Sequence, residues 1–151
     1  MDRAPDRTDE STRLSLTRHY PVTPDKIWQA WTDPKALSQW FGSGQPGSVT
    51  AAEFDLQAGG RFRIAFTGNK GESHECAGVY QELQPFSRLV FSFFWKSTPE
   101  RVSRVTMVLT PDGKGTELLF VHDRFFDTQA RDNHLGGWTQ MLAQLGNFLD
   151  H

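Results

Sequence analysis

Five histidines and a single cysteine are the side chains of this 151-residue sequence best suited to acid–base, nucleophilic or metal chemistry. His122 alternates with Leu118 and Phe120, so it should point inward with them. A neutral imidazole in an apolar pocket can orient a ligand hydroxyl or carbonyl, or act as a general base. The same pattern fits a structural histidine that is held by the backbone or by Asp123. His134, near the start of the last expected helix, is a second candidate.

Metal and nucleophile motifs are weak in comparison. His74 and Cys76 share a strand face, and His122 is the one further candidate ligand, but neither CxxC nor HExxH is present. Cys76 lacks the flanking residues of a thiol enzyme and fits a small buried apolar side chain. The sequence has no Gly-Xaa-Ser-Xaa-Gly elbow, P-loop or dinucleotide fingerprint. We therefore assign no catalytic residue, no metal ligand and no cofactor.

Composition excludes several classes of protein. Sixteen Lys and Arg residues against 18 Asp and Glu give a net charge of −2, which offers no global field for nucleic acid or an anionic membrane. No apolar run approaches the ~20 residues of a membrane span. Residues 1–11 are polar and are expected to form a disordered tail, not a secretory signal, ahead of one domain at 12–151. A lone cysteine makes a reducing cytoplasm the default location.

The periodicity predicts one strand, two short helices, six strands and a long helix. The first strand spans about 12–20, and Thr23-Pro24 and Asp33-Pro34 are typical starts of the two short helices. Strands fill 49–123, with a hairpin turn at 68–71. A stripe from Trp138 to Leu149 indicates the last helix, with Gly136 and Gly137 either early in it or just before it. Short turns between consecutive strands favour an antiparallel sheet, which this helix must cover.

Aromatic residues dominate the apolar set, with 12 Phe and 5 Trp against only 2 Ile and 8 Val. Strand alternation puts many of these rings on the inner face of the sheet, opposite the last helix. A strongly curved sheet and a straight helix cannot touch everywhere, so the rings either fill a closed core or line a cleft. The candidate ligand-binding residues are Trp40, Phe62, Ile64, Phe66, Cys76, Tyr80, Phe91, Phe93, Trp95, Met107, Leu118, Phe120, His122, Trp138, Met141 and Leu142.

Five segments, in order, resemble the activator-of-heat-shock-ATPase-like branch of the START-related (SRPBCC or Bet v-like) superfamily. They are DPKALSQWFG at 33–42, DLQAGGRF at 55–62, GVYQELQP at 78–85 with Arg88-Leu89, GTEL at 115–118 leading to His122, and Gly137-Trp138. The resemblance implies an α+β helix-grip fold, in which a curved antiparallel sheet of seven strands wraps around the C-terminal helix. It also implies a hydrophobic cavity between the sheet and the helix, with Trp40-Phe41 and the 42–47 loop at its mouth.

The sequence leaves three alternatives for the function of the protein. The leading one is a cytoplasmic domain that binds an apolar or aromatic small molecule or a lipid and catalyses no defined reaction. The second is an enzyme resembling polyketide cyclases and aromatases, and the third is a co-chaperone-like interaction module. The co-chaperones carry a large N-terminal domain that binds the chaperone, and only residues 1–11 precede the first strand here, so a chaperone partner is not expected. We expect no nucleic acid and no membrane span, and a homodimer is left open.

Overall fold

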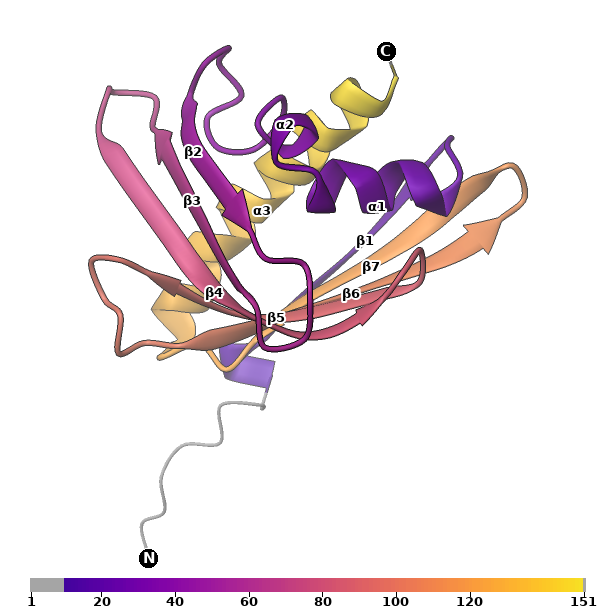
Figure 1. Cartoon of the computed structure of the whole chain (residues 1–151). Helices are drawn as coiled ribbons and strands as arrows, with labels where there is room; N and C mark the ends of the chain where they lie inside the picture. Colours follow the sequence, from indigo (N-terminus) through magenta and orange to yellow (C-terminus); the bar gives the residue numbers. More distant parts are fainter. Residues whose placement is uncertain (1–9, 151) are drawn as a thin grey trace, which may run out of the picture.

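A computed structural model describes residues 10–150 as an α+β fold (Figure 1). The helical elements are η1 (Glu10–Thr12), α1 (Pro24–Thr32), α2 (Pro34–Leu37) and α3 (Thr128–Leu149). The strands are β1 (Leu14–Tyr20), β2 (Val49–Phe54), β3 (Arg61–Thr67), β4 (Ser73–Gln84), β5 (Arg88–Trp95), β6 (Ser103–Asp112) and β7 (Gly115–Asp123). The expected order of elements is confirmed. Of the predicted tail at 1–11, residues 1–9 lie outside the described residues, and Glu10 begins η1.

The seven strands form one antiparallel sheet in the order β1-β7-β6-β5-β4-β3-β2. The sheet curves around α3, with α1 and α2 on the same side as that helix (Figure 1). Tyr20 closes one side of this arrangement, since its buried hydroxyl donates to the carbonyl of Leu142 at 2.9 Å. The helix-grip architecture is confirmed.

Strand β4 bends closely over β5 at Gly78. A Cβ at this position would lie 1.8 Å from the carbonyl oxygen of Ser92, so only glycine fits. The pairing of β4 with β5 shifts register between Tyr80 and Glu82. Gly78 therefore marks a close contact between the two strands.

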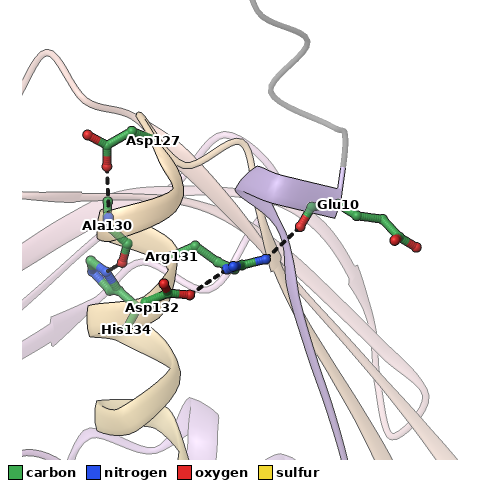
Figure 2. Close-up of polar contacts among 6 residues, drawn as sticks. All are labelled: Glu10, Asp127, Ala130, Arg131, Asp132 and His134. Carbon is green, nitrogen blue, oxygen red and sulfur yellow. Dashed lines mark hydrogen bonds and ion pairs between the residues drawn. The ribbon is translucent and has the colours of Figure 1, made fainter.

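Helix α3 is longer than the apolar stripe predicts. It begins at Thr128 and not near Trp138, because Asp127 caps it by accepting a hydrogen bond from the Ala130 N–H at 2.8 Å (Figure 2). Arg131, in the added segment, donates to the carbonyl of Glu10 at 2.9 Å and so attaches η1 to α3. Gly136 and Gly137 therefore lie inside the helix.

The two short helices differ in detail from expectation. Thr23 is the N-cap of α1, but its side chain does not cap; it donates to the carboxylate of Asp25. Asp33 does cap α2, accepting from the Lys35 N–H at 3.1 Å. Helix α2 ends at Leu37, so Trp40 and Phe41 lie in the turn that follows it, both fully buried.

No helix in the described part of the chain is long and apolar enough to cross a membrane.

Candidate functional site

A pocket of about 400 Å³ opens between the end of the β3–β4 hairpin and the N-terminal half of α3. Its base is apolar and consists of Phe66, Trp95, Trp138 and Met141, all buried or half-buried. Exposed polar side chains surround this base: Asn69, Glu72, His74, Ser97, Asn133 and Gln140. The antiparallel register brings the two groups together, since it pairs Phe66 on β3 with His74 on β4. The result is an apolar floor with a polar rim.

Gly137 keeps the pocket open on the helix side. It is one of the lining residues, and a Cβ added there would meet no other atom within 4 Å. A glycine inside a helix costs roughly 1 kcal/mol relative to alanine. No close approach to a strand requires it, so its evident structural effect is the space that it leaves in the pocket.

The floor residue Trp138 is fixed by a chain of buried hydrogen bonds. Its Nε1–H donates to Nδ1 of His122 at 2.9 Å, and Nε2 of His122 lies 2.7 Å from Oγ of Ser103. Ser103 in turn donates to the carbonyl of Phe93 at 3.0 Å. One tautomer satisfies the whole chain, with the imidazole neutral and its proton on Nε2.

Burial keeps this imidazole neutral. His122 is fully buried on β7, and desolvation, with the His134 ring nearby, lowers its pKa well below the usual value of 6.5. Both ring nitrogens already have partners, so His122 positions the indole of Trp138 and has no free atom for a ligand. Its partners are Ser103 and Trp138, and neither the backbone nor Asp123 holds it.

A second histidine positions the other tryptophan of the floor. The Nε1–H of Trp95 donates to Nε2 of His134 at 2.8 Å, and Nδ1 of His134 donates to the carbonyl of Ala130 at 2.7 Å. Figure 2 shows the His134 ring turned back toward Ala130 on α3. Burial lowers the pKa of His134, which keeps it in the neutral form that accepts from Trp95.

The loop after α2 forms one edge of the pocket and is held by Gln144 of α3. Its Nε2 donates to the carbonyls of Trp40 at 2.7 Å and Gly42 at 3.2 Å. Gly42 and Ser43 line the pocket, but residues 44–47 of the expected mouth do not, and Phe41 borders the interior of the fold. Trp40 does not line the pocket either, because its indole donates to the carbonyl of Ala30 inside the core.

A family match relates this fold to known proteins. Residues 21–150 match the family described as "Activator of Hsp90 ATPase homolog 1-like protein". The chain belongs to this family. No curated protein matches it.

Solved structures agree with this membership of the Activator of Hsp90 ATPase homolog 1-like family. A protein from Rhodobacter sphaeroides is 29% identical with a TM-score of 0.79, covering 93% of each chain. CalU16 from Micromonospora echinospora is 27% identical with a TM-score of 0.70, over 95% of this chain and 81% of that one. Protein CV1439 from Chromobacterium violaceum, 24% identical with a TM-score of 0.80 over 93% of this chain and 98% of its own, shares the fold.

The structure distributes the sixteen candidate residues of this family member over three places. Phe66, Trp95, Trp138 and Met141 form the pocket floor. Phe62, Ile64, Tyr80, Phe91 and Phe93 surround a separate interior void of about 20 Å³, which Trp138 also lines and which is large enough only for a water molecule. The remaining side chains are packed in the core: Trp40, Cys76, Met107, Leu118, Phe120, His122 and Leu142. The rings thus fill the deep part of the cleft and leave its outer end open.

None of the polar rim residues was among the sixteen candidate ligand-binding residues. Asn133 and Gly137 precede the apolar stripe from Trp138 to Leu149, and Gln140 lies between its apolar positions. Glu72 directly follows the turn at 68–71, and the sequence of this segment indicates only a hairpin. The helix cap at Asp127 and the four-residue spacing from His134 to Trp138 are the signals that could have extended the helix over the pocket.

The chemistry of metals and thiols finds no support at this site. Among residues 10–150, no cluster of three or more His, Cys, Asp or Glu side chains could hold a metal ion. Burial raises the pKa of the Cys76 thiol, so the thiol stays protonated in the core.

Proposed function

We propose that this domain binds a planar apolar or aromatic small molecule, or the apolar part of a lipid, in the pocket between the β3–β4 hairpin and α3. The observation that carries the proposal is an open pocket with an aromatic floor. Its volume of about 400 Å³ falls in the range of ~300–1,000 Å³ typical of small-molecule sites. The two indoles of the floor are fixed by histidines, so the surface that meets the ligand is preorganised.

Binding is favoured over catalysis by the state of His122. A general base needs a nitrogen within hydrogen-bonding reach of its substrate, and both nitrogens of His122 are engaged by Trp138 and Ser103. The cyclase-like alternative would require this chain of hydrogen bonds to break. The co-chaperone-like alternative would use an outer surface and gives no role to the pocket.

The proposal includes a cytoplasmic location. The unpaired, buried thiol of Cys76 supports a reducing compartment.

Native mass spectrometry of the purified protein tests the proposal, followed by solvent extraction and a thermal-shift screen with aromatic compounds and lipids. We expect a co-purifying species or a rise in Tm with planar apolar compounds, since a ligand that binds only the folded state stabilises it. The absence of any bound species, together with no thermal shift across the library, would contradict it.

A further inference from the structure

The pocket has an asymmetric charge. Among its described lining residues the one carboxylate is Glu72, and there is no lysine or arginine. Lys70 and Lys96 are close in sequence to the rim but do not line it. Of the two lining histidines, His134 is held neutral by burial. A ligand in this pocket therefore meets a carboxylate at the rim and no lysine or arginine side chain.

The Glu72 carboxylate is held in place. Its Oε1 accepts from the Lys70 N–H at 2.9 Å, and its Oε2 lies 3.5 Å from Nε2 of His74. Gly68 leaves room for it, since a Cβ there would lie 2.4 Å from Cδ of Glu72. Hydrogen bonds from the backbone N–H groups of Glu72 and Lys70 lower the pKa of this carboxyl, so it is ionised at neutral pH.

The apolar floor adds to this preference. The faces of aromatic rings carry partial negative charge and attract cations. Phe66, Trp95 and Trp138 supply the aromatic lining of the pocket below the rim. The aromatic floor and the Glu72 carboxylate at the rim thus both favour a positively charged ligand, and both disfavour a carboxylate or phosphate.

We propose that the pocket selects a flat aromatic ligand that carries a protonated amine, with the rings on Trp95 and Trp138 and the ammonium group near Glu72. This rests on the proposed function and narrows it to one chemical class. Fatty acids and other anionic amphiphiles are then poor ligands, although they match the apolar floor.

Three probes that differ only in their polar group test the selection: 1-naphthaleneethylamine, 1-naphthaleneethanol and 1-naphthaleneacetate. Titration calorimetry at pH 8 and low ionic strength gives their Kd values. We expect the amine to bind about 10-fold more tightly than the acetate, with the alcohol between them, from one partly exposed charge and one cation–π contact. The preference should shrink in high salt, which screens the carboxylate.

The matched variants are Glu72→Gln and Glu117→Gln. Both glutamates are half-exposed (48% and 45%) and lie beside a histidine, at 3.5 Å and 3.7 Å, but Glu117 lies on β7, away from the pocket. Glu72→Gln should reduce the ratio of amine to acetate affinity at least threefold, and Glu117→Gln should not change it. The proposed preference for an amine would be overturned if all three probes bind equally, if the acetate binds more tightly than the amine, or if the two variants have equal effects. The proposed function of the pocket would stand in each of these cases. Failure of all three probes to bind would overturn the proposed function as well.

Discussion

The indole of Trp138 donates to Nδ1 of His122 across 2.9 Å, joining the middle of α3 to the buried end of β7. Trp138 is only 2% exposed, yet one part of its ring reaches the pocket while its N–H faces the core. The same residue also borders the interior void. Trp138 is therefore the wall between the filled part of the cleft and its open end.

Replacement of Trp138 should cost stability in two separable parts. Trp138→Ala removes a buried ring and should lower the free energy of unfolding by ~3–5 kcal/mol. Trp138→Phe keeps most of the ring but leaves Nδ1 of His122 unpaired, at a cost of ~1–3 kcal/mol. Urea denaturation measures both. The half-buried Trp28 on α1 is the control, and Trp28→Ala should cost less than Trp138→Ala; a nearly neutral Trp138→Ala would contradict the packing described here.

Stability should fall as the pH is lowered below about 6.5. Burial lowers the pKa values of His122 and His134 in the folded chain, so the unfolded chain binds more protons in this range. Unfolding is then favoured by acid, by up to ~1.4 kcal/mol per pH unit for each histidine. Denaturation curves between pH 7.5 and 5.5 measure the slope.

The variant His122→Gln separates the contributions of the two histidines. This variant should be less stable than the unmodified chain at pH 7.5, because the substitution disturbs the hydrogen bonds that link Trp138, residue 122 and Ser103. Its stability should depend less steeply on pH than that of the unmodified chain. A stability that is flat from pH 7.5 to 5.5 in the unmodified chain would show that the buried imidazoles are not kept neutral.

Loss of Gln144 should loosen the edge of the pocket. Gln144→Ala removes the donor to the carbonyls of Trp40 and Gly42, at a cost of about 1–2 kcal/mol. Hydrogen exchange of the 40–47 segment, followed by mass spectrometry, should become faster. Gln140→Ala removes only the bond from Gln140 to Gln144 and should have a smaller effect; equal exchange in both variants would argue against Gln144 as the anchor.

The sequence predicts the sheet well and the pocket poorly, for physical reasons. Alternation along Phe62, Ile64 and Phe66 is a local property of a strand, and it correctly orients the rings inward. An open pocket forms instead where the side chains of facing elements leave space unfilled. Here that space lies beside Gly137 and the polar N-terminal part of α3. Local patterns do not show whether opposite rings touch. His122 illustrates this, because its inward direction was predictable but its two partners, on β6 and α3, come from distant segments.

Two adjacent glycines of α3 allow a direct test of where the ligand binds. A side chain at either Gly136 or Gly137 would meet no neighbouring atom within 4 Å at Cβ, but only Gly137 lines the pocket. Both Gly→Leu variants should keep or raise the free energy of unfolding, since leucine favours the helix by roughly 1 kcal/mol over glycine.

The decisive measurement is the affinity of 1-naphthaleneethanol for the Gly136→Leu and Gly137→Leu variants, by titration calorimetry on proteins shown to be folded. We predict that Gly137→Leu fills the pocket and weakens binding at least 10-fold, while Gly136→Leu binds like the unmodified chain. Unchanged affinity in Gly137→Leu would contradict the claim that the ligand lies between the β3–β4 hairpin and α3.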